Sequence, residues 1–594
     1  MSAQLQSLQR LAVDPISVEI IRHGLQSIPD QIEVDITRTA YSVLIYEYKD
    51  YAVGLVDAQG RLICQAKGGI PIFLANVLGL AVRDGLAIYG VEGMAPGDVI
   101  ISNHAGTFGQ HLNNVIMYTP IFGGEGGRQL IAFMCVLAHW TDVGGRYVGS
   151  SASNDTTDIF QEGIQFRTVK LRRAGEPVAE IYRMIEYNTR FPYMTLGDCD
   201  AQLSGCLKGR ALFEEMLGKY GTKTVLAAIE NIWQQSEAAA RAAVRAIPDG
   251  VYEATSFLDN DGVTLDQPIK IDIVVRVEGE EMTIDFSNIA AEVRGPFNSG
   301  AQGGGITAAR LAFKYLTTPG EPTNEGSFKP LRVLLPEGKF LSAGPTAALA
   351  RYSAPLPTVI DTIIRAIADS SPERVAAGHH ANMGSHRFQG RHPRTGALFS
   401  HLDTAHGGWG ASLGRDGAGP YKTLAHGDTL DVPIEVQEAL YPMRVDACGF
   451  RADSGGHGKF RGGLGLDKSY TVGAPCALTV TFERHGCPPW GLFGGGDGEP
   501  GYVEIERVGG ERRTVLKVSD TPLDRGDRVF IHTGGGGGYG SPLQRSPARV
   551  AADVEAGFVS RDAARDAYGV ELDDNGRIDE AATARLRAAR EGRT

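Results

Sequence analysis

The sequence has few cysteines and no paired cysteine motif. Seven Cys among 594 residues are an odd number and form no C-x-x-C pair, and some of them, such as Cys135, lie inside apolar stretches. This pattern excludes a disulfide framework and a cysteine-type zinc site. It predicts reduced thiols in a cytoplasmic protein.

Long runs of positive charge and long apolar runs are also missing. The chain has 58 Lys and Arg against 70 Asp and Glu, a net charge of −12. Nucleic acid and anionic membranes are therefore not expected as partners. The N-terminus has no positively charged start followed by an apolar segment, and we find no window of 18 apolar residues, so neither a signal peptide nor a membrane span is predicted.

Nucleotide-binding fingerprints are absent despite 77 glycines. No G-x-x-x-x-G-K-[ST] motif occurs, and the glycine clusters at 303–305 and 534–538 do not stand between a clear strand and a helix. We therefore interpret these clusters as places where two backbones or a partner subunit pack closely. ATP is not expected to bind to this chain alone.

The first half of the chain mixes helical and strand patterns. Asp14-Pro15 is typical of a helix start, and the apolar spacing predicts a helix up to a break at Pro29. Short apolar runs at 52–56 and 61–64 predict a hairpin. The apolar run 130–138 predicts a strand buried on both faces, although periodicity does not exclude a buried helix.

A second region begins near residue 250. Residues 222–247 predict a long helix, and the following Pro-Asp-Gly ends it. Alternating apolar residues from 269 to 286 predict an antiparallel sheet, and strand-like segments continue to about residue 533. We predict an α+β protein with an N-terminal α/β domain at 1–250, a β-rich domain at 251–540 and a C-terminal helical segment at 541–594.

Imidazoles and carboxylates gather between residues 50 and 145. His111, His139 and Asp142, with Asp50 as a fourth candidate, are residue types that bind Zn²⁺, Mn²⁺ or Fe²⁺. The alternative is structural, since a His at a strand end often only satisfies hydrogen bonds and Asp142 precedes two turn-forming glycines. H-x-x-D is not a specific metal signature.

These features, taken in order along the chain, resemble the hydantoinase B family. That family includes the B-type subunits of ATP-dependent hydantoinases and lactamases, the second half of 5-oxoprolinase, and the α-type subunits of acetone and acetophenone carboxylases. The landmarks that carry the resemblance are Lys49-Asp50-Tyr51, Pro96-Gly97-Asp98-Val99, His111-Leu112, His139 to Gly145, Asp158 to Gly163, Pro248-Asp249-Gly250, Pro433 to Val436, Asp453 to Gly456 and Gly534 to Gly540.

The resemblance implies a divalent metal site and a partner subunit. It carries the metal ligands over to Asp50, His111, His139 and Asp142, with Zn, Mn or Fe as the metal. It also implies a hydantoinase A-like partner that uses ATP to phosphorylate the substrate, so that a hetero-oligomer is expected. His104 or His111 is then the candidate general base.

Three positions depart from the family pattern. His104 and Asn114 stand where relatives commonly carry Asp, and Trp140 stands where many carry a second His. The departures predict a less negative pocket with an aromatic wall, suited to an aromatic or extended aliphatic substrate. Trp140 and Asn114 are therefore the candidate substrate-pocket residues.

The resulting expectation is an enzyme subunit that is active only with its partner. It opens a cyclic amide (hydantoin, oxoproline or lactam) through a phosphorylated intermediate. The alternatives are a subunit of a biotin-independent ketone carboxylase and a non-catalytic assembly subunit whose site has decayed. Glu435 and Glu438 are expected to lie on opposite faces of a strand and to be structural.

Overall fold

The computed structural model describes residues 13–74, 76–151, 153–427 and 429–591. The chain forms two compact units. Unit 1 comprises residues 1–252, 273–356 and 425–432, and unit 2 comprises residues 253–272, 357–424 and 433–594. The first boundary lies close to the predicted residue 250. The rest of the division differs from the predicted domains, because residues 273–356 return to unit 1 and residues 541–594 belong to unit 2.

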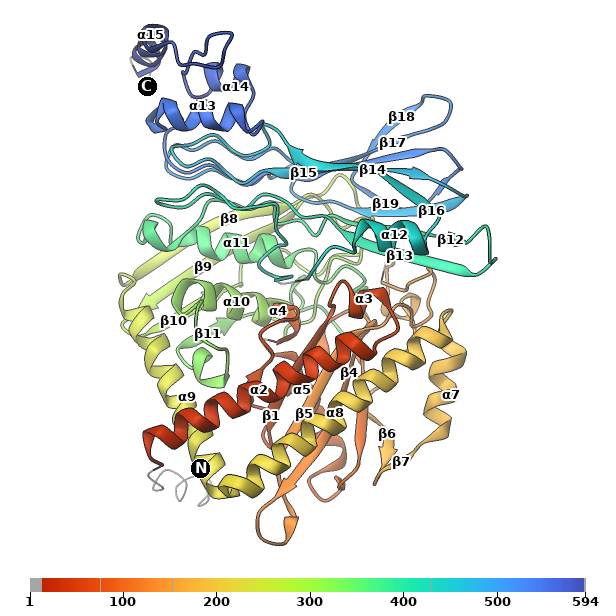
Figure 1. Ribbon diagram of the computed structural model, residues 1–594. Helices are drawn as coiled ribbons and strands as arrows, with labels where there is room; N and C mark the ends of the chain where they lie inside the picture. Colours follow the sequence, from red (N-terminus) through yellow and green to blue (C-terminus); the bar gives the residue numbers. More distant parts are fainter. Residues whose placement is uncertain (1–12, 75, 152, 428, 592–594) are drawn as a thin grey trace. The chain divides into compact units, whose positions relative to one another are not determined.

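A seven-stranded antiparallel sheet forms the centre of unit 1 (Figure 1). The predicted hairpin and the predicted buried strand are both confirmed, and β1 and β5 pair along the whole length of β1. In sheet order the strands are β2 (Leu62–Gln65), β1 (Tyr51–Asp57), β5 (Gln129–His139), β4 (Asn114–Gly123), β3 (Val99–Ser102), β6 (Val169–Arg173) and β7 (Glu176–Pro177).

Helices cover this sheet. The side chain of Asp14 caps α2 by accepting from the N–H of Ser17, as the sequence predicts. The predicted break at Pro29 is wrong, because α2 runs through it with Pro29 buried; packing on neighbouring elements outweighs the lost backbone hydrogen bond. The helices of unit 1 are α2 (Pro15–Thr39), α3 (Val43–Tyr46), α4 (Pro71–Leu74), α5 (Val77–Tyr89), α6 (Ala105–Phe108), α7 (Ala179–Asn188), α8 (Pro192–Tyr220), α9 (Thr222–Arg245) and α10 (Gly305–Thr317).

A four-stranded sheet follows α9 in the order β11-β10-β9-β8. Its strands are β8 (Gly250–Leu258), β9 (Ile269–Glu278), β10 (Glu281–Asp285) and β11 (Leu331–Leu334). The alternation of apolar residues predicts β9 and β10 correctly, and they pair antiparallel. The segment from 273 onward belongs to unit 1 because β10 packs against α9 and β11 against α10.

Unit 2 contains a sandwich of two antiparallel sheets that share one apolar core (Figure 1). Phe388 and Leu478 enter the core from one sheet, and Tyr470, Val503 and Ile531 enter from the other. The first sheet contains β13 (Leu398–Thr404), β12 (Ser385–Arg391), β16 (Cys476–Thr481) and β19 (Lys517–Leu523). The second contains β14 (Met443–Arg451), β15 (Gly465–Val472), β20 (Arg528–His532), β17 (Tyr502–Glu506) and β18 (Arg512–Val515).

Short helices complete unit 2. The predicted strand around Glu435 and Glu438 is a helix, α12, because the short apolar spacing there also fits a short helix after Pro433. Ser546 and Ser560 cap α13 and α14 with their side chains, as the sequence predicts. The helices of this unit are α11 (Leu356–Ala366), α12 (Ile434–Leu440), α13 (Pro547–Glu555), α14 (Arg561–Asp566) and α15 (Glu580–Glu591).

The glycine run 534–538 is packed closely against other backbone. The N–H groups of Gly536 and Gly538 donate to the carbonyls of Gly463 and Gly496, and the carbonyls of the same two glycines accept from Gly456 and Leu492. We call the run and the segments 407–410, 455–463 and 491–498 around it the glycine layer. The prediction of close backbone packing is confirmed.

By length and composition alone, the stretch Pro71–Tyr89, which contains α4 and α5, is apolar enough to cross a membrane. This differs from the sequence prediction of no such window. Most of the stretch is buried inside the fold, as in the core helix of a folded protein.

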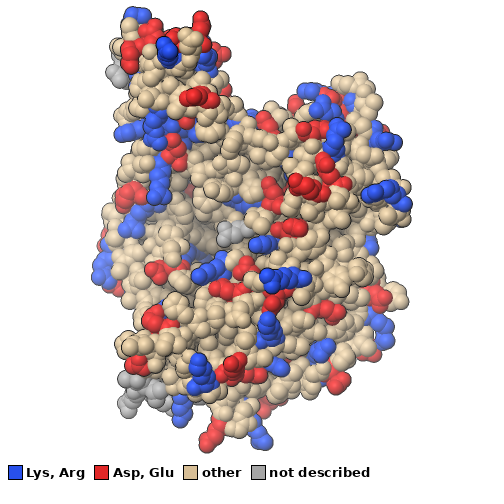
Figure 2. Space-filling view, viewed as in Figure 1, with Lys and Arg blue, Asp and Glu red and all other residues tan. Residues whose placement is uncertain are grey.

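On the face shown in Figure 2, Lys and Arg side chains are mixed with Asp and Glu. All seven cysteines are free, and four of them are buried.

Candidate active site

Strand pairing brings the ends of three strands of unit 1 together. Tyr51 at the start of β1 pairs with Ala138, and Asn114 at the start of β4 pairs with His139 at the end of β5. The N–H of His139 donates to the carbonyl oxygen of Asp50 at 3.0 Å. Asp50, Asn114 and His139 therefore meet at one edge of the sheet.

His111 joins this edge from the loop before β4. Its ring meets the ring of His139 at 4.9 Å and that of Tyr352 at 4.8 Å, both nearly perpendicular. The His111 Nε2 lies 2.9 Å from Asn114 Oδ1, and the Asn114 amide donates to the Tyr352 hydroxyl at 2.9 Å and to Gln110 Oε1 at 3.1 Å. A fixed polar cluster results.

The orientation of His111 limits what its ring can do. Nδ1 faces the carbonyl oxygen of Ala350 at 3.3 Å, and Nε2 faces the amide oxygen of Asn114. Both neighbours are acceptors, so a neutral imidazole donates to only one of them.

Asp50 is a buried carboxyl with an unusual environment. Burial raises its pKa to about 8, because desolvation penalises the charged form. Among the described residues, no hydrogen-bond donor reaches its Oδ1. Burial also raises the pKa of the Tyr352 hydroxyl, and the charge of Asp50 adds to that shift. A positive charge beside Asp50 would reverse the direction of its shift.

Asp142 is held differently from the other three candidate ligands. Its Oδ1 accepts from the N–H of Gly149 and from the Arg190 guanidinium, both at 2.8 Å. Its Oδ2 accepts from the N–H of Arg190 at 2.8 Å. The side chain of Asp142 is fully buried, and the contacts on both oxygens are those of a structural carboxylate.

Within the parts of the chain that the structure describes, no group of three or more His, Cys, Asp or Glu side chains is arranged to hold a metal ion. The two imidazoles that meet are His111 and His139, and Asp50 adjoins His139 through its backbone. Both carboxylate oxygens of Asp142 already accept hydrogen bonds, from Gly149 and Arg190. Asp142 is therefore the least suited of the four candidate ligands, and the side chains of the other three are not arranged as a metal site in this structure.

His104 lies in its own local environment. Its Nδ1 is 3.0 Å from the Thr107 hydroxyl of the same loop, and its pKa is lowered, first by burial and then by the charge of Arg167. Residues in and just after α6 line a cavity of about 490 Å³ together with residues 300–302 and part of the segment 335–349. His104 is thus placed beside this cavity, whereas His111 is in the cluster at the strand ends.

Trp140 is part of the core. It is 1% exposed, and its indole N–H donates to Gln202 Oε1 of α8 at 2.7 Å. The amide of Gln202 in turn donates to carbonyls of Val115 and Val136, on β4 and β5. The indole therefore fastens α8 to the sheet.

Glu162 and Tyr352 belong to the site but do not follow from the sequence reasoning. Glu162 is buried, its pKa is raised to about 8 by desolvation, and its Oε1 accepts from the N–H groups of Leu349 and Ala350 at 2.8 and 2.9 Å. It thereby fixes the segment whose carbonyl contacts His111. The Asp158 to Gly163 landmark is a signal for Glu162, whereas nothing in the sequence marks Tyr352.

The segment 425–432 also reaches this region. The N–H of Ile72 donates to the carbonyl of Ala425, and the N–H of Leu430 donates to that of Tyr48, two residues before Asp50. Sequence reasoning assigns this segment to the β-rich domain. Its contacts place it in unit 1.

Sequence comparison identifies the family. The Hydantoinase B/oxoprolinase family matches residues 14–542. The chain belongs to this family. The caprolactamase beta chain of Pseudomonas jessenii is 31% identical over 590 residues, covering 97% of this chain and 99% of the relative. A putative D-/L-hydantoinase B-type subunit of Pseudomonas sp. (strain NS671) is 29% identical over 590 residues, covering 97% and 98%.

Two solved structures share the fold of this chain. The ATP-dependent caprolactamase from Pseudomonas jessenii matches with a TM-score of 0.88 and 29% identity, covering 97% of this chain and 100% of that chain. A nucleotide-free acetone carboxylase matches with a TM-score of 0.88 and 20% identity, covering 98% and 83%. The predicted α+β, multi-domain fold class and the resemblance are both confirmed.

Proposed function

We propose that this chain is the subunit of an ATP-dependent enzyme that opens a cyclic amide and that it acts with a hydantoinase A-like, ATP-using partner. The proposal is supported by full-length similarity to a caprolactamase beta chain and to a hydantoinase B-type subunit. Ketone carboxylation is the second candidate. It has weaker support, because the acetone carboxylase at 20% identity shares the fold alone.

The cluster of Asp50, His111, His139 and Tyr352 is the observation that carries this proposal. An amide carbonyl is a poor electrophile, and a phosphorylated intermediate made by the partner would remove that barrier. Within this chain, Asn114 and the Ala350 carbonyl would orient the His111 ring, and Asp50 would remain protonated until a positive charge approaches. The cluster thus offers proton donors beside one buried carboxyl.

A divalent cation, Zn²⁺, Mn²⁺ or Fe²⁺, is part of the proposal. Asp50, His111 and His139 would hold it, and the contacts of Asp142 exclude that residue from the proposed set. When bound, such an ion supplies an activated water or a polarised carbonyl. We also propose a cytoplasmic location and a hetero-oligomer, since relatives are named as subunits.

The test is reconstitution with a hydantoinase A-like, ATP-using subunit. ATP hydrolysis is measured with a panel of lactams, hydantoins, oxoproline and ketones. A cyclic amide should stimulate turnover, His139→Ala should abolish it, and His23→Ala, which removes an exposed imidazole on α2, should not. Stimulation by ketones with bicarbonate would favour the carboxylase. Stable complex formation without stimulation by any compound would favour the assembly subunit.

A further inference from the structure

Unit 2 contains a buried cluster of Asp361, His379 and Arg484 that the proposed function does not use. Asp361 lies on α11. Its Oδ1 contacts His379 Nδ1, and its Oδ2 accepts from the N–H of His379 at 3.1 Å. The Arg484 Nη1 lies 3.6 Å from the same Oδ2. The imidazole and the guanidinium are therefore neighbours on one carboxylate.

All three side chains are at least nine-tenths buried, with exposed fractions of 5% for Asp361 and His379 and 1% for Arg484. Nevertheless His379 Nε2, Arg484 Nε and Arg484 Nη1 have no hydrogen-bond partner among the described residues. The contact of Arg484 Nη2 with the Pro488 carbonyl is long, at 3.4 Å. Leaving a buried polar atom without a hydrogen bond is destabilising, so three such atoms together point to a bound molecule.

Aromatic rings hold the cluster in place. Trp490 contacts two guanidiniums, with Arg484 at 4.3 Å and Arg365 at 4.8 Å from its ring. The Trp409 ring lies 5.7 Å from that of His379. Because these contacts fix the ring and the guanidinium, their unsatisfied nitrogens are preorganised for a ligand.

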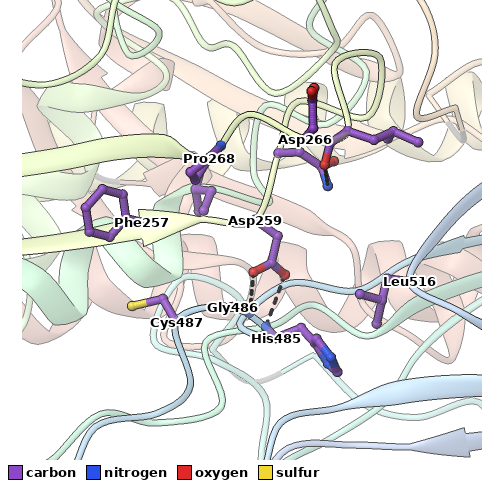
Figure 3. A pocket seen from close by; sticks show the side chains of 11 residues that line it. Phe257, Asp259, Asp266, Pro268, His485, Gly486, Cys487 and Leu516 are labelled. Carbon is purple, nitrogen blue, oxygen red and sulfur yellow. Dashed lines mark hydrogen bonds between the residues drawn. The ribbon is translucent and has the colours of Figure 1, made fainter.

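Unit 2 also contains a pocket of about 470 Å³, lined in part by the segment that follows Arg484 (Figure 3). Three of the residues that line it, His485, Gly486 and Cys487, directly follow Arg484 in the chain. The Asp259 carboxylate is itself satisfied by the N–H groups of His485 and Gly486 at 3.0 and 2.7 Å.

The chemistry of the unsatisfied atoms selects the ligand. In the neutral tautomer with its proton on Nδ1, His379 donates a hydrogen bond to Asp361, and its Nε2 then carries a lone pair that accepts a hydrogen bond. Arg484 offers N–H donors and a permanent positive charge. A cation is disfavoured beside Arg484, because the permanent positive charge of its guanidinium repels one.

We propose that Asp361, His379 and Arg484 form a binding site for a small oxyanion that carries a proton, of the bicarbonate or monohydrogen phosphate class. The negative oxygens accept from Arg484, and the O–H donates to His379 Nε2. Asp361 orients both groups. The site consists only of unit 2 residues, and the inference does not depend on the proposed amide hydrolysis.

The test is direct binding to the purified full-length chain. Phosphate is followed by ³¹P NMR and bicarbonate by ¹³C NMR, with tryptophan fluorescence as a second readout because Trp490 contacts Arg484. Phosphate, bicarbonate or both should bind saturably, and the stronger of the two identifies the source. Sulfate carries no proton at neutral pH and should bind about tenfold more weakly or not at all.

Variants localise the signal. Arg484→Gln and His379→Phe should each weaken binding by about tenfold or more. Arg365→Gln, which removes the second guanidinium from the same indole, should weaken it by less than about threefold. Trp490→Phe should remove the fluorescence response and keep the NMR response. Thermal melts identify any variant that does not fold.

Three results would overturn the proposal. The first is no saturable binding of either anion to the wild-type chain at tens of millimolar, which would leave water as the occupant. The second is sulfate binding as tightly as phosphate, which would remove the proton-accepting role of His379. The third is unchanged binding in folded Arg484→Gln, which would place the anion elsewhere.

Discussion

The carboxylate of Asp142 and the imidazole of His139 are three residues apart but have different surroundings. Asp142 is saturated by Gly149 and Arg190, whereas His139 belongs to the cluster with His111. We therefore expect Asp142→Ala to lower the free energy of unfolding by about 2 kcal/mol or more and to keep binding of the proposed metal. His139→Ala should lose the metal and keep most of the stability. Thermal melts and metal analysis of both purified variants check this; a metal-free Asp142→Ala variant that melts like the wild type would return Asp142 to the ligand set.

Glu162 makes stability depend on pH. Burial raises its pKa from 4.5 in the unfolded chain to about 8 in the folded one. The folded state therefore holds a proton that unfolding releases, and stability falls as the pH rises from about 4.5 to about 8. Glu162→Gln removes this titration, so its melting temperature relative to wild type should rise across that window and level off above it. Melts of both proteins from about pH 4 to about pH 9 test this, and parallel curves would show that Glu162 does not hold the proton.

The residues of the candidate site differ in how far the sequence predicts them. His111 and His139 follow from residue type and loop position, because an imidazole at a strand end is visible in the sequence. Tyr352 reaches His111 from 241 positions along the chain, and no local pattern marks such a contact. Asp142 looks like a ligand until its partner Arg190 is known. Local patterns give the type of chemistry, and only the fold shows which polar atoms are already satisfied.

At the scale of elements, Trp140 and Gln202 link the end of β5 to α8. Replacing Trp140 by Phe keeps the aromatic character but leaves the buried Gln202 oxygen without its donor. We expect the free energy of unfolding to fall by about 1–3 kcal/mol, with little change in substrate preference. Chemical denaturation and the substrate panel measure the two effects. The sequence hypothesis of an aromatic pocket wall would instead be supported by altered preference at unchanged stability.

The glycine layer leaves no space for side chains. A Cβ on Gly536 would lie 2.0 Å from the carbonyl oxygen of Trp409, and the neighbour is backbone that has no room to move. We expect Gly536→Ala to cost more than about 3 kcal/mol or to prevent folding. Gly509→Ala is the matched control, since nothing lies within 4 Å of its added Cβ, and it should change stability by less than about 0.5 kcal/mol. Equal melting temperatures for the two variants would contradict close packing in the layer.

Elements with one clear period are the ones that the sequence predicts best. The hairpin β1–β2, the strand β5, the alternation in β9 and β10, and the caps of α13 and α14 all follow from local rules. The misses have a tertiary cause. α2 continues through Pro29 because that residue is buried against other elements, and α12 replaces a predicted strand because its short apolar pattern fits both periods.

At the scale of the whole molecule, Arg545 attaches the C-terminal helices to the rest of unit 2. Its guanidinium is 1% exposed and contacts Asp416 and Asp553, each at 2.7 Å; burial lowers its pKa, but these carboxylates outweigh burial and raise the pKa overall. We expect Arg545→Leu to lower the free energy of unfolding by about 3–5 kcal/mol, because it leaves Asp553 and Asp416 without their shared cation.

Arg549 offers a control for that variant, since it also reaches Asp416 but is 53% exposed. Arg549→Gln should change stability by less than about 1 kcal/mol. Limited proteolysis would show whether the segment 541–594 becomes susceptible in Arg545→Leu. Resistance equal to the wild type would mean that this segment is held by its apolar contacts alone. The predicted separate C-terminal segment would then need no ionic attachment.

The glycine layer also has a thermodynamic signature. It buries peptide groups against peptide groups and contains little apolar side-chain surface of its own. Exposing peptide surface on unfolding lowers the heat-capacity change, by about 0.26 cal/K/mol for each Å², whereas exposing apolar surface raises it. The layer therefore offsets part of the contribution of the neighbouring sandwich core. Unit 2 gains a flatter stability curve from it, so that cooling weakens this part of the fold less than it weakens a purely apolar core of equal size.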